Sequence, residues 1–477
     1  MGNRTSRLKE TRRQLKMVLD DEQASWPSRG SSVNASTRQS MLDVSIRSSE
    51  DEHSAFVSAA QLGCPDMIRL MLDVGVPVNI PDTGGWTALH AAAKAGHFNV
   101  VQLLLDNKAS VNPETDSGVT PLHLAAQHGH LAIAQALVQR GADIHARDAN
   151  GATSLFAAVE GGHTPICMML LQCGAQVNQR KHGGWTPLHK ACEGNKAAIV
   201  GALLDAGADV HATQDDGISC LFSATHFRRA AVVQKLLSCG VDPNAANKVG
   251  LTPLHVAAAA GDVKLAKTLV YGGADLNAET LGGESPLMVA INCQHSHMVR
   301  ELLGLGAAVN ASSQVAGWGP VHLAARLGRV DLMKALLDQG GNASLALMGS
   351  SPLHVAARAG HTDLLRLLLL HGADVNAADH AGCSALHYTA QRGDLLATEL
   401  LLQNAALVDT QTADGATAVF LAAFFGHTKT VELLVDYDAN VALPDSFGQT
   451  PIGLARGTAN WYLVRLLNET EDAVTFV

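Results

Sequence analysis

Apolar residues in this chain gather in short blocks that predict pairs of helices joined by turns. Residues 121–128 read PLHLAAQH and residues 131–138 read LAIAQALV, with only Gly129 and His130 between them. The first block supplies Leu and Ala for packing, and the second supplies spaced Leu, Ile and Val. A polar stretch with turn-forming residues leads to the next pair of blocks. The expected unit is therefore two short helices followed by a turn.

This pair of blocks recurs along the chain at a nearly constant interval. The opening tetrapeptide is TPLH or a close variant, and the step is 33 residues, apart from 34 and then 32 around Gly319. A degraded copy opens at Ser54, which gives thirteen expected units over roughly residues 51–467. The tetrapeptide itself begins at Thr87, Thr120, Thr153, Thr186, Ser219, Thr252, Ser285, Gly319, Ser351, Ser384, Thr417 and Thr450.

Each recurring residue has a physical reason to be there. Thr or Ser at the start of the tetrapeptide caps the first helix, and the Pro that often follows loses nothing by lacking an N–H at the first helical position. Paired alanines such as Ala125 and Ala126 allow close approach of helices. Glycines such as Gly129 end the first helix in a left-handed conformation, and a second Gly such as Gly141 ends the second helix.

These residues resemble the ankyrin repeat, and the resemblance covers residues 51–467. It implies an all-α solenoid, in which helix pairs stack into a curved slab and β-turn fingers project to one side. One such unit cannot bury its apolar face alone, so contacts between neighbouring units supply the core. The resemblance also implies that fingers and first helices line a concave face, which binds protein partners. Trp461 and Tyr462 are expected to cover the exposed side of the last stack.

Composition and charge narrow the classes of function. Hydrophobic residues make up 47% of the chain and aromatics only 4%, which leaves Ala and Leu as packing material. The formal charge is 34 − 44 = −10, but residues 1–17 alone carry +5, so the remaining 460 residues carry 28 − 43 = −15. An acidic body disfavours nucleic-acid binding. The eight cysteines lack a C-x-x-C pair and are expected to be small core residues in a reducing compartment.

The 22 histidines raise the hypothesis of a metal site, but most of them belong to the repeat. Two recurring sets are expected to bond backbone groups near the turns, and close pairs such as His295 and His297 lack the spacing of a zinc helix. No nucleotide-binding or hydrolase motif is present, so we expect no catalytic residue, cofactor, metal or small-molecule substrate. The first set is His90, His123, His189, His255, His322, His354 and His387, and the second is His97, His130, His163, His361 and His427.

Candidate partner-binding residues are those that depart from the repeat at exposed positions. Trp86, Trp185 and Trp318 precede the tetrapeptide on three fingers, either as interface anchors or as packing over the neighbouring finger. The finger sequence at 344–348, SLALM, replaces the usual polar turn and places Leu347 there, either as a binding patch or as a packing repair after the shifted register. A basic and aromatic strip is predicted on the groove side of the first helices, from Arg326, Arg358, Tyr388, Arg392, Phe424 and Phe425.

The start of the chain carries a second signal. MGNRTS matches the pattern for N-myristoylation of Gly2, and the basic arm over residues 1–20 would supply attraction to an anionic membrane. The alternative is an ordinary solvated arm. Residues 21–50 are Ser-rich and are expected to form a flexible linker. Ser48 and Ser49 precede three acidic residues, a setting that resembles acid-directed kinase sites. The expected location is the cytoplasm, at the inner face of the plasma membrane if the arm is lipidated.

The end of the chain, residues 468–477, is expected to be a short tail. Its last four residues read VTFV, so Thr475 and Val477 resemble the ligand of a PDZ domain. The leading hypothesis is a non-enzymatic scaffold or adaptor. Two alternatives are the substrate-recognition subunit of a ubiquitin ligase, which would need a helical box after the last repeat, and an ankyrin-type transcriptional regulator.

Overall fold

The structure is a computed structural model that describes residues 49–313, 317–457 and 461–475. Its contacts divide the chain into two units, one ending at Val241 and one beginning at Asp242, and each is described by itself. Within the described residues the secondary structure is helical, with 26 α-helices in consecutive pairs and no strand. A short 3-10 turn, η2 (His182–Gly184), lies in the first unit.

The first unit holds six pairs of helices: α3 (Ser49–Gln61) and α4 (Pro65–Asp73), α5 (Ala88–Ala95) and α6 (Phe98–Asp106), α7 (Pro121–His128) and α8 (Leu131–Gln139), α9 (Ser154–Gly161) and α10 (Thr164–Gln172), α11 (Pro187–Glu193) and α12 (Ala197–Asp205), α13 (Cys220–His226) and α14 (Ala230–Ser238).

The second unit holds the other seven pairs: α15 (Pro253–Ala260) and α16 (Val263–Tyr271), α17 (Pro286–Asn292) and α18 (Ser296–Gly304), α19 (Pro320–Leu327) and α20 (Val330–Asp338), α21 (Pro352–Ala359) and α22 (Thr362–Leu370), α23 (Ala385–Arg392) and α24 (Leu395–Gln403), α25 (Ala418–Phe424) and α26 (Thr428–Asp436), α27 (Pro451–Gly457) and α28 (Trp461–Thr475).

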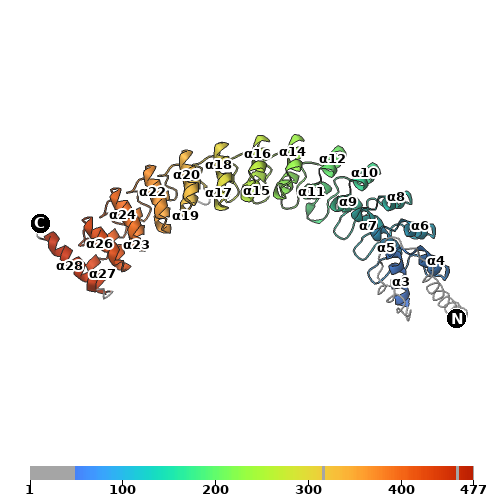
Figure 1. The fold of residues 1–477 in the computed structure, drawn as a ribbon, viewed down its shortest axis with the longest axis horizontal. Helices are drawn as coiled ribbons and strands as arrows, with labels where there is room; N and C mark the ends of the chain where they lie inside the picture. Colours follow the sequence, from blue (N-terminus) through green and yellow to red (C-terminus); the bar gives the residue numbers. More distant parts are fainter. Residues whose placement is uncertain (1–48, 314–316, 458–460, 476–477) are drawn as a thin grey trace, which may run out of the picture. The chain divides into compact units, whose positions relative to one another are not determined.

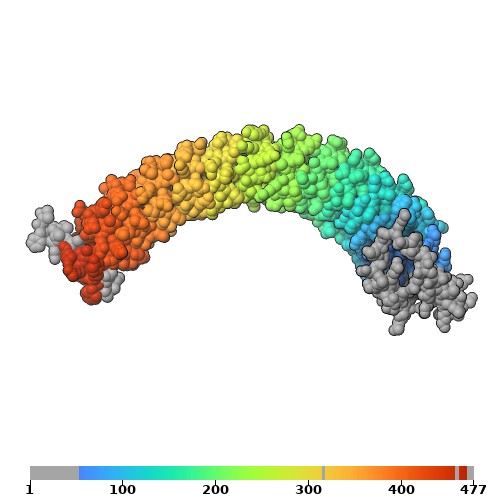
Figure 2. All heavy atoms as spheres, viewed as in Figure 1, coloured from blue at the N-terminus to red at the C-terminus, as the bar shows by residue number. Residues whose placement is uncertain are grey.

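Helices of each unit stack in two layers. The first helix of a pair contacts the first helix of the next pair; α21, for example, contacts α23. The second helices contact one another in the same way, and α22 contacts α24. In the second unit α17, α19 and α23 lie in one row and α18, α20 and α22 in another (Figure 1). Successive repeats of a unit lie directly against each other in the space-filling view (Figure 2). This is the stacked all-α arrangement that the sequence predicts.

The core lies between the two layers and between successive repeats. In α7 the side chains of Leu122, Ala125 and Ala126 are buried, and in α8 those of Ile133 and Leu137 are buried. Small alanines on the first helices let the helices approach closely, and the branched residues fill the remaining space. Burying one such Leu or Ile contributes about 1.5–3 kcal/mol relative to exposure. Each repeat therefore depends on its neighbours for most of its stability.

The seven tetrapeptide histidines are buried and bonded to the backbone of the next repeat, as the sequence predicts. In α7, His123 Nδ1 accepts a bond from the Thr120 backbone N–H at 3.2 Å, and His123 Nε2 donates to the Ala152 carbonyl oxygen at 3.1 Å. His322 is the exception at one of its ring nitrogens. The N-cap of its helix is Gly319, which lacks a hydroxyl, and His322 Nδ1 has no partner among the described residues. The other five histidines bond in the same way as His123.

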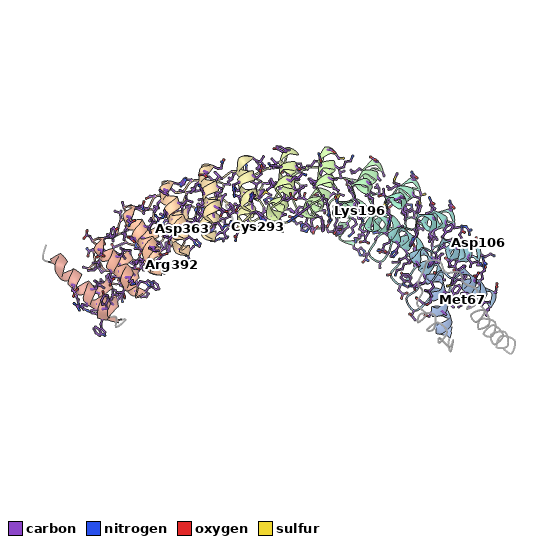
Figure 3. The ribbon with its side chains drawn as sticks, in the orientation of Figure 1. Met67, Asp106, Lys196, Cys293, Asp363 and Arg392 are labelled. Atoms are coloured by element: carbon purple, nitrogen blue, oxygen red, sulfur yellow. The ribbon has the colours of Figure 1, made fainter. Side chains whose placement is uncertain are left out.

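A second set of bonds joins the ends of first helices in adjacent repeats. His163 Nε2 donates to the Gln127 carbonyl oxygen at 3.0 Å, and the other predicted histidines of this set make equivalent bonds. In two repeats a cation stands in place of the histidine: Lys196 donates to the Glu160 carbonyl and Arg229 to the Glu193 carbonyl. In a third repeat Asp394 holds the histidine position, and Arg392, two residues earlier, donates to the Arg358 carbonyl. Figure 3 marks Lys196 and Arg392 at these places. We call this contact the cross-repeat bond.

Asparagines of the fingers, the turn segments between a second helix and the next first helix, also link neighbours. The Asn112 side chain donates to the Gly141 carbonyl at 3.2 Å and accepts from the Asp143 N–H at 2.8 Å. Asn178, Asn244 and Asn376 repeat both bonds in their own repeats. The fingers are thus tied together by side chains as well as by the packing of the helices.

Two predictions about packing are wrong. Trp461 and Tyr462 are 72% and 61% exposed, so they do not cover the last stack; the Tyr462 hydroxyl donates to Glu432 Oε1 at 2.8 Å. Four of the eight cysteines are exposed, because they lie at the ends of helices, where a repeat faces solvent. These are Cys64, Cys173, Cys239 and Cys293, while Cys167, Cys192 and Cys220 are buried and Cys383 is half-buried.

The described ends of the array differ slightly in extent from the expected boundaries. Helix α3 begins at Ser49, and α28 continues to Thr475, beyond the expected end of the repeats at residue 467. None of the described helices is both long enough and apolar enough to span a bilayer.

Replacing Gly129 by Ala should cost more stability than replacing Gly141 by Ala. Both glycines are left-handed, with φ of +85° and +87°, so each substitution carries about 1–2 kcal/mol of backbone strain, partly offset in the unfolded chain. A Cβ on Gly129 would lie 2.5 Å from His163 Cε1, whereas one on Gly141 meets nothing within 4 Å. We expect an additional loss of about 1–3 kcal/mol for Gly129→Ala, measured by urea unfolding. Equal losses would show that the close approach to His163 contributes nothing.

Acid should destabilise the fold through the tetrapeptide histidines. Burial lowers the pKa of His189 from its ordinary 6.5 to about 4, and burial lowers the pKa of the other six as well. The unfolded chain then binds protons that the folded chain excludes, so this stability is present above about pH 6.5 and falls as the pH drops toward 4. Urea unfolding across this range should show that decline. His189→Gln removes one titrating group and should flatten its slope; an unchanged slope would contradict the assignment.

Candidate interaction surface

The first-helix face of the second unit carries the side chains that the sequence singles out for partner binding. This face is the solvent-accessible side of the first helices together with the adjoining fingers. The predicted residues between Trp318 and Phe425 lie on four consecutive first helices, α19, α21, α23 and α25, or on the fingers before them. Successive first helices of this series are in contact, so their exposed side chains form a continuous surface.

The three finger tryptophans are half-buried and packed on the histidine of their own repeat. The Trp318 and His322 ring centroids are 6.1 Å apart, and the Trp86 and Trp185 rings lie at 5.8 and 6.4 Å from their own histidines. A cation covers each indole: Lys94 over Trp86, Lys181 over Trp185 and Arg326 over Trp318. These contacts favour packing as the main role of the tryptophans.

Arg326 and Arg358 occupy the same place in consecutive first helices and are both exposed. The Arg326 guanidinium carbon lies 5.6 Å from the centre of the Trp318 ring, and its Nη2 is 3.4 Å from Asn292 Oδ1. No ion pair involves either arginine among the described residues. These two cations therefore face solvent without a carboxylate of their own chain.

Tyr388 is held by a carboxylate and does not project freely. Its hydroxyl donates to Asp379 Oδ2 at 2.5 Å. Burial, and then this hydrogen bond, raise the pKa of Tyr388 well above its ordinary value. Although burial would raise the pKa of Asp379, the Tyr388 hydroxyl and the backbone amides of Cys383 and Ala381 lower it. Asp379 is therefore an ionised carboxylate that is already engaged.

Arg392 differs from the other two arginines of the strip because it makes the cross-repeat bond. Its Nη1 donates to the Arg358 carbonyl oxygen at 3.3 Å, and its guanidinium lies against Gly360, where a Cβ would come within 2.4 Å of Nη2. Other repeats make this bond from the residue two places later, which is Asp394 in this repeat. Changing Arg392 would therefore disturb the stacking of α21 on α23, so its loss cannot report on partner binding alone.

The aromatic end of the strip is exposed. Phe424 and Phe425, at the end of α25, are 53% and 47% exposed, with ring centroids 5.1 Å apart in an edge-to-face arrangement. The second ring also stacks on His427 at 6.3 Å. Exposed aromatic pairs of this kind supply large contact area to a partner at a low entropic cost.

The sequence predicts Leu347 as a binding residue of the finger before α21, but its neighbour Met348 is the more exposed of the two. The Leu347 and Ser350 backbones exchange two hydrogen bonds of 3.0 Å, which close a tight turn without the polar cap of other fingers. Met348 adopts a φ of 49° at the tip, is 73% exposed and lies against Gly317. The sequence signal for Met348 is the one that indicated Leu347: the SLALM stretch replaces the usual polar turn and places Met at position 348.

Several predicted sites lie at or beyond the limits of the described residues. Gly2, Ser48 and Val477 fall outside them. Ser49 and Thr475 are the first residue of α3 and the last residue of α28. These assignments stay predictions.

The first unit has a hollow next to Trp86. It encloses about 430 Å³ against α3, α5 and α7, and its lining includes Asp82, Lys94 and His128. Across the part of the chain that is described, no three or more His, Cys, Asp or Glu side chains are grouped so that they could hold a metal ion.

Comparison with known proteins identifies the family to which this architecture belongs. The chain gives no match among curated proteins. The family model described as ankyrin repeats (3 copies) matches five overlapping or adjacent stretches, at residues 56–148, 141–214, 221–313, 305–379 and 386–472. These matches extend over most of the chain and coincide with the stacked helix pairs, so the protein belongs to the ankyrin-repeat family.

Proposed function

We propose that the protein is a non-enzymatic scaffold or adaptor that binds a protein partner on the first-helix face from α19 to α25. Ankyrin repeats generally mediate protein–protein interaction and are typically non-enzymatic modules. The observation that carries the proposal is the exposed and unpaired state of Arg326 and Arg358, beside the exposed Phe424 and Phe425. Every inward side chain of these repeats is already used in packing, so only outward groups are available to a partner.

The chemistry of this surface suits a protein interface. Arginine and aromatic residues are the side chains that most often dominate binding energy. Two exposed phenylalanines offer apolar area that a partner would remove from water, at about 25 cal/mol per Å². The arginines add orientation, because a guanidinium can bond both oxygens of a carboxylate. Aromatic area and directional charge together favour a specific partner over nonspecific adhesion.

Site-specific cross-linking tests where the partner binds. A photoreactive phenylalanine analogue placed at Phe424 should form partner adducts, because this exposed ring would lie within the interface. The same analogue at Leu370, an exposed residue of α22 on the second-helix layer, serves as the matched control and should form few. Adducts of equal yield at both positions, or at Leu370 alone, would move the binding site off the first-helix face.

Reversing the charge of Arg358 should weaken capture of the cross-linked partner by about tenfold while leaving the fold intact, because its guanidinium makes no ion pair in the described structure. Arg366→Glu on α22 makes the same charge change on the second-helix layer and should leave capture unchanged. Circular dichroism and urea unfolding check that both variants fold. Arg392 is unsuitable for this test because it makes the cross-repeat bond.

We further propose that Gly2 is myristoylated and that the arm tethers the scaffold to the cytoplasmic face of an anionic membrane. The support is the MGNRTS sequence together with the +5 balance of residues 1–17. One acyl chain gives only marginal membrane binding, and each nearby basic residue adds about 1 kcal/mol. Acyl chain and charge together would be enough for stable, salt-sensitive attachment.

Gly2→Ala should move the protein from the membrane fraction to the soluble fraction and abolish labelling by an alkyne analogue of myristate. Asn3→Ala keeps the acceptor glycine and should behave as wild type. Labelling of the wild type would establish the lipid independently of where the protein is found. A wild type that is unlabelled and already soluble would rule out the tether and leave the interaction proposal untouched.

A further inference from the structure

We infer that the partner presents an extended acidic segment to the first-helix face, with two carboxylates that pair with Arg326 and Arg358. This inference rests on the proposed function, because it names the chemistry of the partner at the same surface. It follows from the charges that the face leaves unpaired, from their spacing along the stack, and from the exposed apolar finger tip of the repeat that carries Arg358.

The position of these two charges is what sets them apart in an acidic chain. Residues 18–477 carry 28 − 43 = −15, so cations are outnumbered by acids over the body of the protein. Some arginines pair with carboxylates, as Arg140 does with Asp106 at 2.7 Å, whereas others, such as Arg366 on the second-helix layer, make no ion pair in the described structure. Two exposed arginines without such a partner on adjacent first helices form a local positive site on an acidic protein.

Two carboxylates bond neighbouring side chains of this face: Glu284 bonds Asn292, which also contacts Arg326, and Asp379 bonds Tyr388. Asp379 accepts the Tyr388 hydroxyl together with the Ala381 and Cys383 backbone amides. Glu284 Oε1 accepts from the Asn292 side chain at 3.0 Å. Neither acid forms an ion pair with Arg326 or Arg358 in the described structure. A carboxylate supplied by a partner would therefore meet cations that no local acid has neutralised.

The spacing of the arginines selects the shape of the segment. They stand at equivalent places on helices packed side by side, and such helices are about 8–10 Å apart. In an extended polyproline II segment, residues i and i+3 project from the same side about 9 Å apart. Two acidic residues at i and i+3 would thus reach Arg326 and Arg358 together.

The finger before α21 supplies an apolar contact for the same segment. Met348 is 73% exposed, and it belongs to the same repeat as Arg358. An extended segment projects its other side chains away from the row of acids, so an apolar residue between the two acids can turn toward the finger. Flexible Met side chains adapt to varied apolar partners. The expected recognition pattern is therefore two acids three residues apart with an apolar residue between them.

Selection of displayed peptides on the full chain tests this inference. Random linear peptides of about twelve residues, at about 3.3 Å per residue, are long enough to span three repeats. The enriched sequences should carry Asp or Glu at i and i+3 with an apolar residue between them. Binding of a synthetic enriched peptide should weaken about tenfold with Arg326→Glu or Arg358→Glu, and as salt rises.

Matched variants define the contacts of that peptide. Arg366→Glu should leave affinity unchanged, Met348→Ser should weaken it, and an Asp-to-Asn or Glu-to-Gln change in the peptide should reproduce the loss seen with the arginine variants. Unfolding curves of each variant separate lost binding from lost folding. Enriched peptides without the acidic pair, peptides whose acids lie seven residues apart in a helix, or affinity that ignores both arginines would each overturn the inference.

Two further outcomes separate this inference from the proposed function. If the selected peptides cross-link at Phe424 but lack the acidic pair, the inference of an acidic segment is overturned, while the proposal that this face binds a protein partner is retained. The Gly2→Ala chain could also bind phosphatidylserine vesicles. If adding Arg326→Glu to that chain abolished this binding, the positive site would be assigned to a membrane, and the peptide would be overturned as its ligand.

Discussion

The structure depends on contact between neighbouring repeats, because no helix pair can bury its apolar side alone. Leu122 and Ile133 are buried only because helices of adjacent repeats close over them. The same constraint applies to polar groups: the buried His123 finds its acceptor, the Ala152 carbonyl, in the following repeat. Inward residues are thus committed to the stack, and the chemistry of the protein is confined to outward side chains.

The cross-repeat bond shows how strictly geometry, rather than residue type, is maintained. His163 provides a ring N–H, Lys196 an ammonium and Arg392 a guanidinium, yet all three donate to the carbonyl at the end of the preceding first helix. Any donor of suitable length serves. Where the donor is Lys196 or Arg392, the same bond brings a positive charge to the end of the first helices, so structural needs and surface charge are coupled.

Most of the fold could be predicted from sequence because its determinants are local and recur. The cap formed by Thr120 and the left-handed Gly129 both lie within one motif. The roles of Arg392, Cys293 and Trp461 could not be predicted, because they depend on which side chain of an adjacent repeat lies opposite. Arg392 meets a carbonyl 34 residues away, a relation that no short motif records. The place of the candidate residues on the first helices could be predicted, but the pairing of Tyr388 with Asp379 and the exposure of Met348 required the structure.

Charges that are already paired and charges that are not have different consequences for binding. In the first unit Lys190 bonds Glu193 at 2.9 Å and lies 3.4 Å from Glu160, so a partner charge there would first have to displace an internal one. In the second unit Arg326 and Arg358 have no ion pair to break. No carboxylate competes for their guanidinium groups in the described structure, and dehydration of arginine is less costly than that of lysine. An anionic partner therefore gains more at Arg326 and Arg358 than at Lys190, although both units share one repeat and one packing scheme.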